Sequence, residues 1–326
     1  MIAPELTTRL QDNDETVVIE ALRDICQIDE EQISQAVVEH VTTFLLHENI
    51  SVSVQALETM QHLAQTSLAL PKNRILNALT FLAKSSETPR VRGESAIALV
   101  LVDDPATSET VSVLIKLLDD EHPRVRQEAA AALGDSSAKK AIPVLLEHLS
   151  DPDEQTRFEC SFALASMKDS RGLPLLLDSL SSSKRRIDAL EGIRRLADKS
   201  ALSTLEPLSR KFFLGWPERL TVLATMYAVG DKTVVPRITE KAESRNKAEK
   251  ALAIGLIGTH GIVEAVEFLS RTIEKAEESL ALQIIDTLKV LGTSEAFSAI
   301  TKIASSDRLS NQVMEAAKAY VDARKN

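Results

Sequence analysis

The spacing of apolar residues over Pro123–Leu149 predicts two helices joined by a turn. One stripe of the first helix holds apolar residues at i, i+4, i+7 and i+8, the spacing typical of an amphipathic helix. These residues are Val125, Ala129, Ala132 and Leu133. Gly134 follows directly, and we expect it to end this helix because glycine accepts a positive φ at no steric cost. Pro143 is tolerated near the start of the next helix.

The same helix pair recurs along the whole chain. The position equivalent to Leu133 is assigned to Ile25, Met60, Leu99, Leu133, Leu164, Ile193, Val229, Ile257, Leu291 and Val321. These positions span 296 residues in nine intervals. The mean period of about 33 residues is that of a two-helix solenoid unit. Four of the positions are followed by glycine, at Gly134, Gly230, Gly258 and Gly292, and we interpret all four as the same turn.

The segment VRQEAAAALGD, followed by AIPVLLEHLSD, resembles the short bacterial HEAT repeat of the kind found in phycobilin lyases. The resemblance implies an all-α fold, an α-solenoid (right-handed superhelix) of about ten two-helix HEAT-like repeats. We expect a single solenoid over residues 1–326. Residues 1–66 are expected to form atypical acidic N-terminal repeats and residues 294–326 a C-terminal capping repeat, because end repeats must show a polar face to water.

The charge of the chain is concentrated at one end. Residues 1–66 contain twelve acidic residues against Arg9 and Arg23, which accounts for the whole formal net charge of −10. Such an end could attract a partner protein with a basic surface, or it could simply keep the protein in solution. Lys184–Lys211 is locally basic, although its cations are typical of a solvated helix surface. Nucleic acid is disfavoured as a partner, because the chain is acidic and only 3% aromatic.

The sequence offers no sign of a membrane or an exported protein. The longest clear apolar run, Ile97–Val102, is far shorter than a membrane-spanning helix, and Met1–Leu10 lacks the features of a signal peptide. We therefore expect no membrane partner and a cytoplasmic location. Cys26 and Cys160 lie on helical stripes of different repeats, and we expect two buried thiols rather than a disulfide.

Charged residues recur beside the core stripe of the second helix of each repeat. They are Arg92 and Glu94, Arg126 and Glu128, Arg157 and Glu159, and Arg186 and Asp188. We interpret them as a structural ladder in which each arginine meets an acid of a neighbouring repeat, because the guanidinium fork suits a carboxylate. The alternative is a metal enzyme, since deoxyhypusine hydroxylase is also a HEAT-repeat protein and binds iron through His-Glu pairs at this helical position. The residue before each acid is here Gly93, Gln127, Phe158 or Ile187. We therefore expect no metal site, cofactor or catalytic residue.

Apolar side chains interrupt the polar face of three successive repeats. The two positions opposite the core stripe, Gln127 and Ala131 in one repeat, become Phe158 and Phe162, then Ile187 and Glu191, then Leu223 and Tyr227. The only tryptophan, Trp216, lies in the same region. The family resemblance places these second helices on the concave side of the superhelix. Two interpretations remain open, because the side chains could bind a partner protein or fill the gap between neighbouring helices.

These features favour a non-catalytic protein-binding scaffold or adaptor that uses the concave face of the solenoid. The alternative function comes from the resemblance alone: a tetrapyrrole (bilin) lyase or a chaperone-like protein. Short HEAT repeats occur in many unrelated proteins, so the resemblance carries the fold better than the activity. The chain contains no Gly-x-Ser-x-Gly elbow or phosphate-binding loop, so an enzyme is disfavoured.

Overall fold

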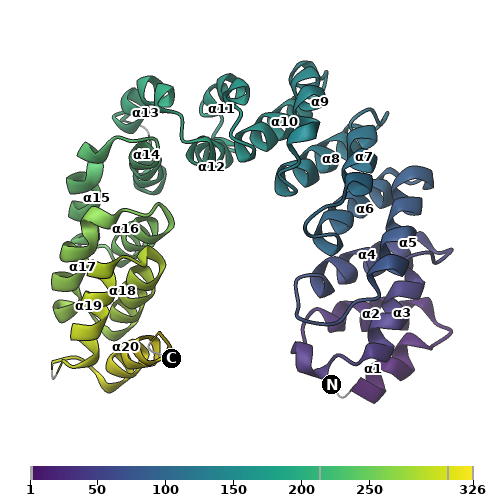
Figure 1. Ribbon diagram of the computed structural model, residues 1–326, viewed down its shortest axis with the longest axis horizontal. Helices are drawn as coiled ribbons and strands as arrows, with labels where there is room; N and C mark the ends of the chain where they lie inside the picture. The colour runs from purple at the N-terminus through teal and green to yellow at the C-terminus, as the bar shows by residue number, and fades with distance from the viewer. Residues whose placement is uncertain (1–2, 213, 307, 325–326) are drawn as a thin grey trace. The chain divides into compact units, whose positions relative to one another are not determined.

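The computed structural model describes residues 3–212, 214–306 and 308–324. These residues form twenty α-helices and several short 3₁₀ helices, and they contain no strand (Figure 1). The α-helices form ten pairs in chain order. The prediction of an all-α solenoid of about ten two-helix repeats is therefore confirmed. No helix in the described parts of the chain is long and apolar enough to cross a lipid bilayer.

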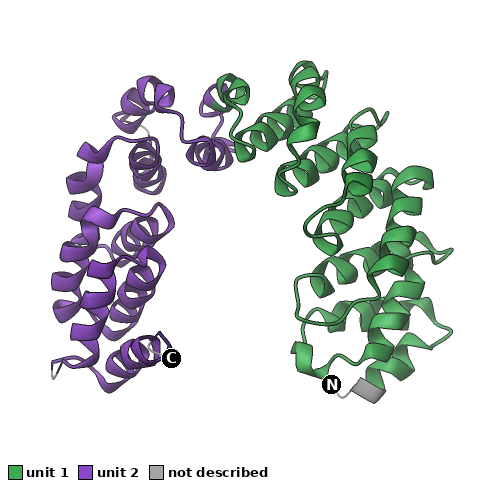
Figure 2. Cartoon of the chain, in the orientation of Figure 1, with its two compact units in different colours: residues 1–176 green, residues 177–326 purple. Residues whose placement is uncertain are grey.

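The chain divides into two compact units (Figure 2). Unit 1 is Met1–Leu176. Its first helices are α1 (Ala3–Leu10), α3 (Gln35–Phe44), α5 (Lys72–Ser85), α7 (Ser108–Leu117) and α9 (Ile142–Glu147). Its second helices are α2 (Glu15–Ile25), α4 (Ile50–Leu63), α6 (Pro89–Val102), α8 (Pro123–Asp135) and α10 (Glu154–Ser166). Each second helix packs against the next, from α2 to α10, so they form one layer of unit 1.

Unit 2 is Leu177–Asn326, and the boundary falls inside α11 (Leu173–Ser179). The first helices of unit 2 are α13 (Leu202–Ser209), α15 (Val235–Ala242), α17 (Val266–Thr272) and α19 (Ser294–Ala304). The second helices are α12 (Arg186–Leu196), α14 (Trp216–Ala228), α16 (Lys247–Thr259), α18 (Glu278–Leu291) and α20 (Asn311–Ala323). They also pack one against the next, from α12 to α20.

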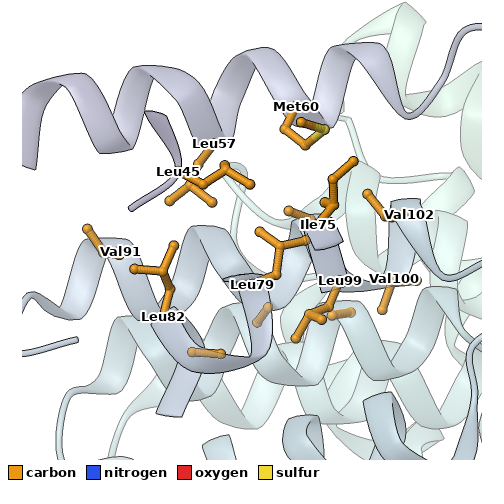
Figure 3. Packing of buried hydrophobic residues seen from close by; sticks show 14 of the residues in the cluster. Leu45, Leu57, Met60, Ile75, Leu79, Leu82, Val91, Leu99, Val100 and Val102 are labelled. Carbon is orange, nitrogen blue, oxygen red and sulfur yellow. The ribbon is translucent and has the colours of Figure 1, made fainter. Parts of the chain in front are cut away.

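The core of unit 1 runs between its two layers of helices. Figure 3 shows part of it, where Leu79 of α5 lies among side chains of α4 and α6. Met60 and Leu99, assigned from the sequence as equivalent core positions, are both fully buried. Burial of leucine-sized side chains on each repeat stabilises the stack by about 1.5–3 kcal/mol per side chain relative to exposure.

Two of the ten assigned core positions are shifted by three residues. In six consecutive repeats the residue four positions after the core position has a positive φ: Ser137, Lys168, Ala197, Gly230, Gly261 and Gly292. This pattern places the true equivalents of Leu133 at Met226 and Leu288, which are both buried, in place of Val229 and Leu291. A shift of three residues is less than one helical turn, so apolar residues near the stripe conceal it.

The four glycines assigned to one turn have two different roles. Gly230 and Gly292 have φ values of +109° and +62°, which suit the left-handed residue after a helix. Gly134 lies inside α8, and the left-handed residue of its turn is Ser137, so the prediction that Gly134 ends the helix is wrong. A Cβ on Gly134 would lie 2.9 Å from the Cα of Ala163. The absence of a side chain at Gly134 therefore permits close packing of α8 against α10.

The predicted end repeats coincide with helix pairs. Residues 1–66 contain α1 to α4, and residues 294–326 contain α19 and α20, although residues 1, 2, 307, 325 and 326 of these ranges lie outside the described part of the chain. That the two compact units form a single solenoid over residues 1–326 stays a prediction.

Candidate functional site

The predicted aromatic strip begins on α10 with Phe158 and Phe162, whose ring centroids lie 6.3 Å apart. Phe158 is only 5% exposed, whereas Phe162 is half-buried. A buried ring cannot meet a partner protein unless its helix moves. The burial therefore favours the packing interpretation for Phe158.

On α14 the core position is Met226, three residues before the position assigned from the sequence. Leu223 and Tyr227 are therefore not the residues that lie opposite the core stripe. Leu223 is 3% exposed and belongs to the core. Tyr227 is half-buried, and its hydroxyl donates to the carboxylate of Glu264 and lies 3.3 Å from the carbonyl oxygen of Gly261. Burial and the neighbouring Glu264 carboxylate raise the pKa of Tyr227 to about 12. Tyr227 therefore links two neighbouring repeats of unit 2.

The exposed part of the predicted strip lies at the starts of α12 and α14. Ile187 is 48% exposed and Trp216 is 38% exposed. The Arg186 guanidinium pairs with the Glu218 carboxylate and so brings these two helix starts together. Ile187 and Trp216 are each within two residues of this ion pair. Both side chains are exposed, and their role in binding a partner protein stays a prediction.

Sequence reasoning missed Phe212, which lies in the turn before α14 and is 89% exposed. The signal was present as two consecutive phenylalanines in KFFLGW, directly before Trp216. Such a cluster is conspicuous in a chain with eight phenylalanines in total. Periodicity does not predict a role for Phe212, because this residue lies in a turn and outside the apolar stripe of either helix. We call Ile187, Phe212 and Trp216 the apolar surface of unit 2.

The arginine ladder exists, but its acidic partners are not the predicted ones. Arg92 forms two hydrogen bonds to Asp120, from Nε at 2.7 Å and from a terminal nitrogen at 2.8 Å. Arg126 repeats this geometry on Asp151, with both contacts at 2.8 Å. Each aspartate lies in the turn between the two helices of the following repeat. The prediction of Arg92–Glu and Arg126–Glu rungs is therefore corrected to Arg–Asp rungs.

The same arginines also bind backbone carbonyls of their own repeat. Arg126 donates to the carbonyl oxygen of Asp120 at 2.9 Å, and Arg157 donates to that of Asp151 at 2.7 Å. Arg186 donates to the carbonyl oxygen of Leu180 at 2.8 Å. The corrected register adds Arg219, whose guanidinium lies 2.9 Å from the carbonyl oxygen of Lys211. These bonds satisfy carbonyl groups that the end of the first helix leaves open.

The Asp151 carboxylate is held charged by its partners. Burial alone would raise its pKa, but the Arg126 guanidinium and the backbone N–H of Asp153 lower it below the ordinary value of 3.8. A carboxyl group with a lowered pKa contributes stability above its unfolded-state pKa and loses it as the pH falls through the folded-state value. The Arg126–Asp151 rung therefore stabilises unit 1 throughout the neutral range.

The predicted acids occupy other contacts on the second helices. Arg124 bridges two of them, with Nε 2.8 Å from Glu128 and a terminal nitrogen 3.1 Å from Glu94. Glu159 accepts a hydrogen bond from Gln155 at 2.6 Å. Asp188 is exposed. Gly93 provides the space for Glu128, since a Cβ at Gly93 would lie 1.5 Å from Oε2 of that carboxylate.

Among these acids, Glu128 has a buried oxygen, Oε2, without a hydrogen-bond partner in the described part of the chain. Burial raises the pKa of Glu128 above the ordinary value of 4.5, while Arg124 opposes the shift. The folded chain thus holds this proton more tightly than the unfolded chain, so ionisation of Glu128 lowers the free energy of unfolding.

We expect wild type to lose stability relative to Glu128→Gln as the pH rises from 4.5 through the raised pKa of Glu128. The glutamine keeps an oxygen for Arg124 but cannot ionise. Urea denaturation of both proteins at several pH values between about 4 and 8 measures the difference in unfolding free energy. A difference that stays constant over this range would contradict the assignment.

The two cysteines lack the environment of a nucleophile. Burial raises the pKa of the Cys160 thiol to about 12 and also raises the pKa of Cys26. Both are free thiols as predicted, but only Cys160 is buried, whereas Cys26 is half-buried. In the residues that the structure describes, no group of three or more histidine, cysteine, aspartate or glutamate side chains is arranged to hold a metal ion.

The repeats match a known family over the middle of the chain. Residues 76–157 and 111–194 match the family model for HEAT repeats. Residues 76–194 therefore contain HEAT repeats. No curated protein matches the sequence.

The chain is also similar to solved structures. One is the complex of CpcE and CpcF of phycocyanin lyase from Nostoc sp. PCC7120, with 21% sequence identity and a TM-score of 0.51. That match covers 78% of this chain and 97% of the other. An engineered protein matches with 19% identity and a TM-score of 0.41, over 99% of this chain and 98% of its own. At 21% identity, the likeness to the phycocyanin lyase complex establishes the fold alone.

Proposed function

We propose that this HEAT-repeat chain is a non-catalytic scaffold that binds another protein, and that the apolar surface of unit 2 is a contact region. The observation that carries the proposal is the exposure of Ile187, Phe212 and Trp216, of which Ile187 and Trp216 are within two residues of the Arg186–Glu218 ion pair in sequence. Large apolar side chains of this kind are expensive to leave in water, and aromatic anchors dominate protein interfaces. Phe158 and Leu223 are excluded from the contact region because both are buried.

The excess of acidic residues in residues 1–66 supports a second part of this proposal. The partner protein has a basic surface that approaches these residues. Several acids of this stretch are engaged within the chain, including Glu39 with Arg74 and Glu58 with Arg90. Others, such as Glu20 and Glu48, do not appear in any ion pair of the described residues. Such exposed charges steer a partner over a distance of about 10 Å at 0.1 M salt.

The double variant Ile187→Ser with Trp216→Ser is expected to weaken partner binding by about thirtyfold, the loss typical of hot-spot anchors. The partner is isolated by affinity capture from native lysate with the wild-type chain, identified by mass spectrometry and titrated against purified variants. Repeating the titration between about 50 and 500 mM salt measures the contribution of the acidic stretch, which is expected to fall as the charges are screened.

The matched control is Leu46→Ser with Val290→Ser, which removes two apolar side chains that are 53% and 68% exposed elsewhere. This control should bind the partner as wild type does. Circular dichroism melting curves show whether each variant remains folded. Equal losses of affinity in both double variants would refute the assigned contact region.

A second candidate function is the handling of a tetrapyrrole such as a bilin, as a lyase or a chaperone-like protein. Its support is the resemblance of the repeats and the structural likeness to the phycocyanin lyase complex, which spans nearly all of the matched lyase chain. Mixing the purified chain with phycocyanobilin separates the two candidates. A shifted absorption band at stoichiometric bilin would favour the tetrapyrrole function over the scaffold.

A further inference from the structure

A groove of about 870 Å³ lies between α17 and α19 in unit 2. Apolar side chains form its floor, among them Val266, Ile273 and Ile303, all less than 9% exposed. Val263 adds an apolar side chain that is 41% exposed at one end. The apolar side chains most open to water in the groove are therefore Val263 and the half-buried Leu309, above a nearly buried floor.

The walls of this groove are acidic. Four glutamates line it against a single lysine, Lys302: Glu264, Glu267, Glu274 and Glu295. Glu264 is already engaged, because its carboxylate lies 2.6 Å from Lys232 Nζ and accepts from Tyr227. Glu267 and Glu274 are exposed, and neither appears in an ion pair of the described residues. Two carboxylates thus face water beside an apolar floor.

The charges of α17 and the turn after it are sorted between two sides. Glu267 and Glu274 face the groove toward α19, whereas Arg271 and Lys275 line a separate cavity with Lys250. Arg271 stands four residues after Glu267 and three before Glu274, a spacing at which helical charges can pair. No ion pair of the described residues joins Arg271 to either acid, so both acids are available to an incoming positive charge.

The dimensions of the groove suit a short helix. Its wall α19 has eleven residues, which corresponds to about 16 Å or three helical turns. Glu295, Ser298 and Lys302 line it at helical spacing, as do Glu267, Ser270 and Glu274 on the other wall. A helix laid in such a groove places apolar side chains at i, i+3, i+4 and i+7 on the floor and its flanking residues against the walls.

We propose that the groove between α17 and α19 binds a cationic amphipathic helix of a partner protein. The proposal rests on the scaffold function and adds a second contact region with a defined partner chemistry. Apolar side chains of the helix pack against Val263 and Leu309 above the floor, and flanking lysine or arginine residues pair with Glu267 and Glu274. An anionic phospholipid surface is disfavoured as the occupant, because four glutamates line the groove.

The test uses the full-length chain and a fluorescein-labelled 14-residue peptide of leucine and lysine in an amphipathic helical pattern. Fluorescence anisotropy is expected to show saturable binding. Glu267→Lys with Glu274→Lys should weaken the affinity by about tenfold or more, because two attractions become repulsions. Ser298→Trp, which fills the groove without changing its charge, should also weaken it by about tenfold.

The matched control is Glu240→Lys with Glu315→Lys, which changes the net charge equally at exposed positions of α15 and α20. Its affinity should stay within about twofold of wild type. No saturable binding, equal losses in both charge variants, or equal binding of a leucine–glutamate peptide would each overturn the proposal. Failure here is distinct from failure of the scaffold function, because that function is measured with its own partner and with Ile187 and Trp216.

Discussion

Replacing Phe158 with alanine is expected to lower the free energy of unfolding by about 3–5 kcal/mol. The ring is 5% exposed on α10 and packs in unit 1, so its removal leaves a cavity that the surrounding helices can close only in part. Urea denaturation followed by far-UV circular dichroism measures the loss. Unit 1 should show it most, because each repeat of a solenoid is stabilised mainly by its neighbours.

Phe162→Ala is the matched control for this prediction. Phe162 lies one turn further along α10 and is only half-buried, so its truncation should cost clearly less than that of Phe158. Leu133→Ala provides the positive control, because Leu133 is fully buried. If Phe158→Ala lowers the free energy of unfolding by less than about 1 kcal/mol, the size typical of surface changes, the packing interpretation is wrong. Phe158 would then belong to an open binding surface.

Arg126→Met is expected to cost about 3–5 kcal/mol of unfolding free energy. The substitution leaves the Asp151 carboxylate, whose side chain is 3% exposed, without its bidentate partner. It also removes the donor that serves the Asp120 carbonyl oxygen at 2.9 Å. The Asp153 N–H and His148 Nδ1 remain beside Asp151, but a buried carboxylate that loses its guanidinium partner is costly because the protein interior cannot replace its hydration. Thermal and urea denaturation at neutral pH measure the effect.

Arg90→Met serves as the control, because Arg90 pairs with Glu58 at 2.8 Å on the exposed surface. Its loss should stay below about 1 kcal/mol. The double variant Arg126→Met with Asp151→Asn should recover part of the stability that Arg126→Met loses, since no uncompensated charge remains. If Arg126→Met and Arg90→Met cost the same, the ladder does not lock neighbouring repeats.

The Arg–Asp rungs join successive repeats of unit 1. Arg92 and Arg126 each join one repeat to the turn of the next through an aspartate. The turn before α12 carries Leu180 at the position equivalent to Asp120 and Asp151, and here the arginine rung has no aspartate to meet. The ladder of Arg–Asp rungs therefore ends near the boundary between the two units at Leu176 and Leu177.

The sequence by itself determined the helix pairs, their period and most of the core. The apolar stripe of α8, from Val125 to Leu133, is buried where the periodicity placed it. This succeeded because an amphipathic helix buries one face, and residues three and four apart share that face. The arginines of the ladder were found for the same reason, since each stands at a constant offset from a core position.

Only the tertiary structure decided which neighbour each side chain meets. Periodicity could not separate Met226 from Val229, because both are apolar, both are buried and they lie within one turn. It could not show that Gly134 allows close packing against Ala163 while Gly230 ends a helix, since both glycines follow an apolar residue. The exposure of Trp216 and the burial of Phe158 likewise depend on contacts with helices about thirty residues away. Such contacts are set by the stacking of repeats, which a single helix pattern does not contain.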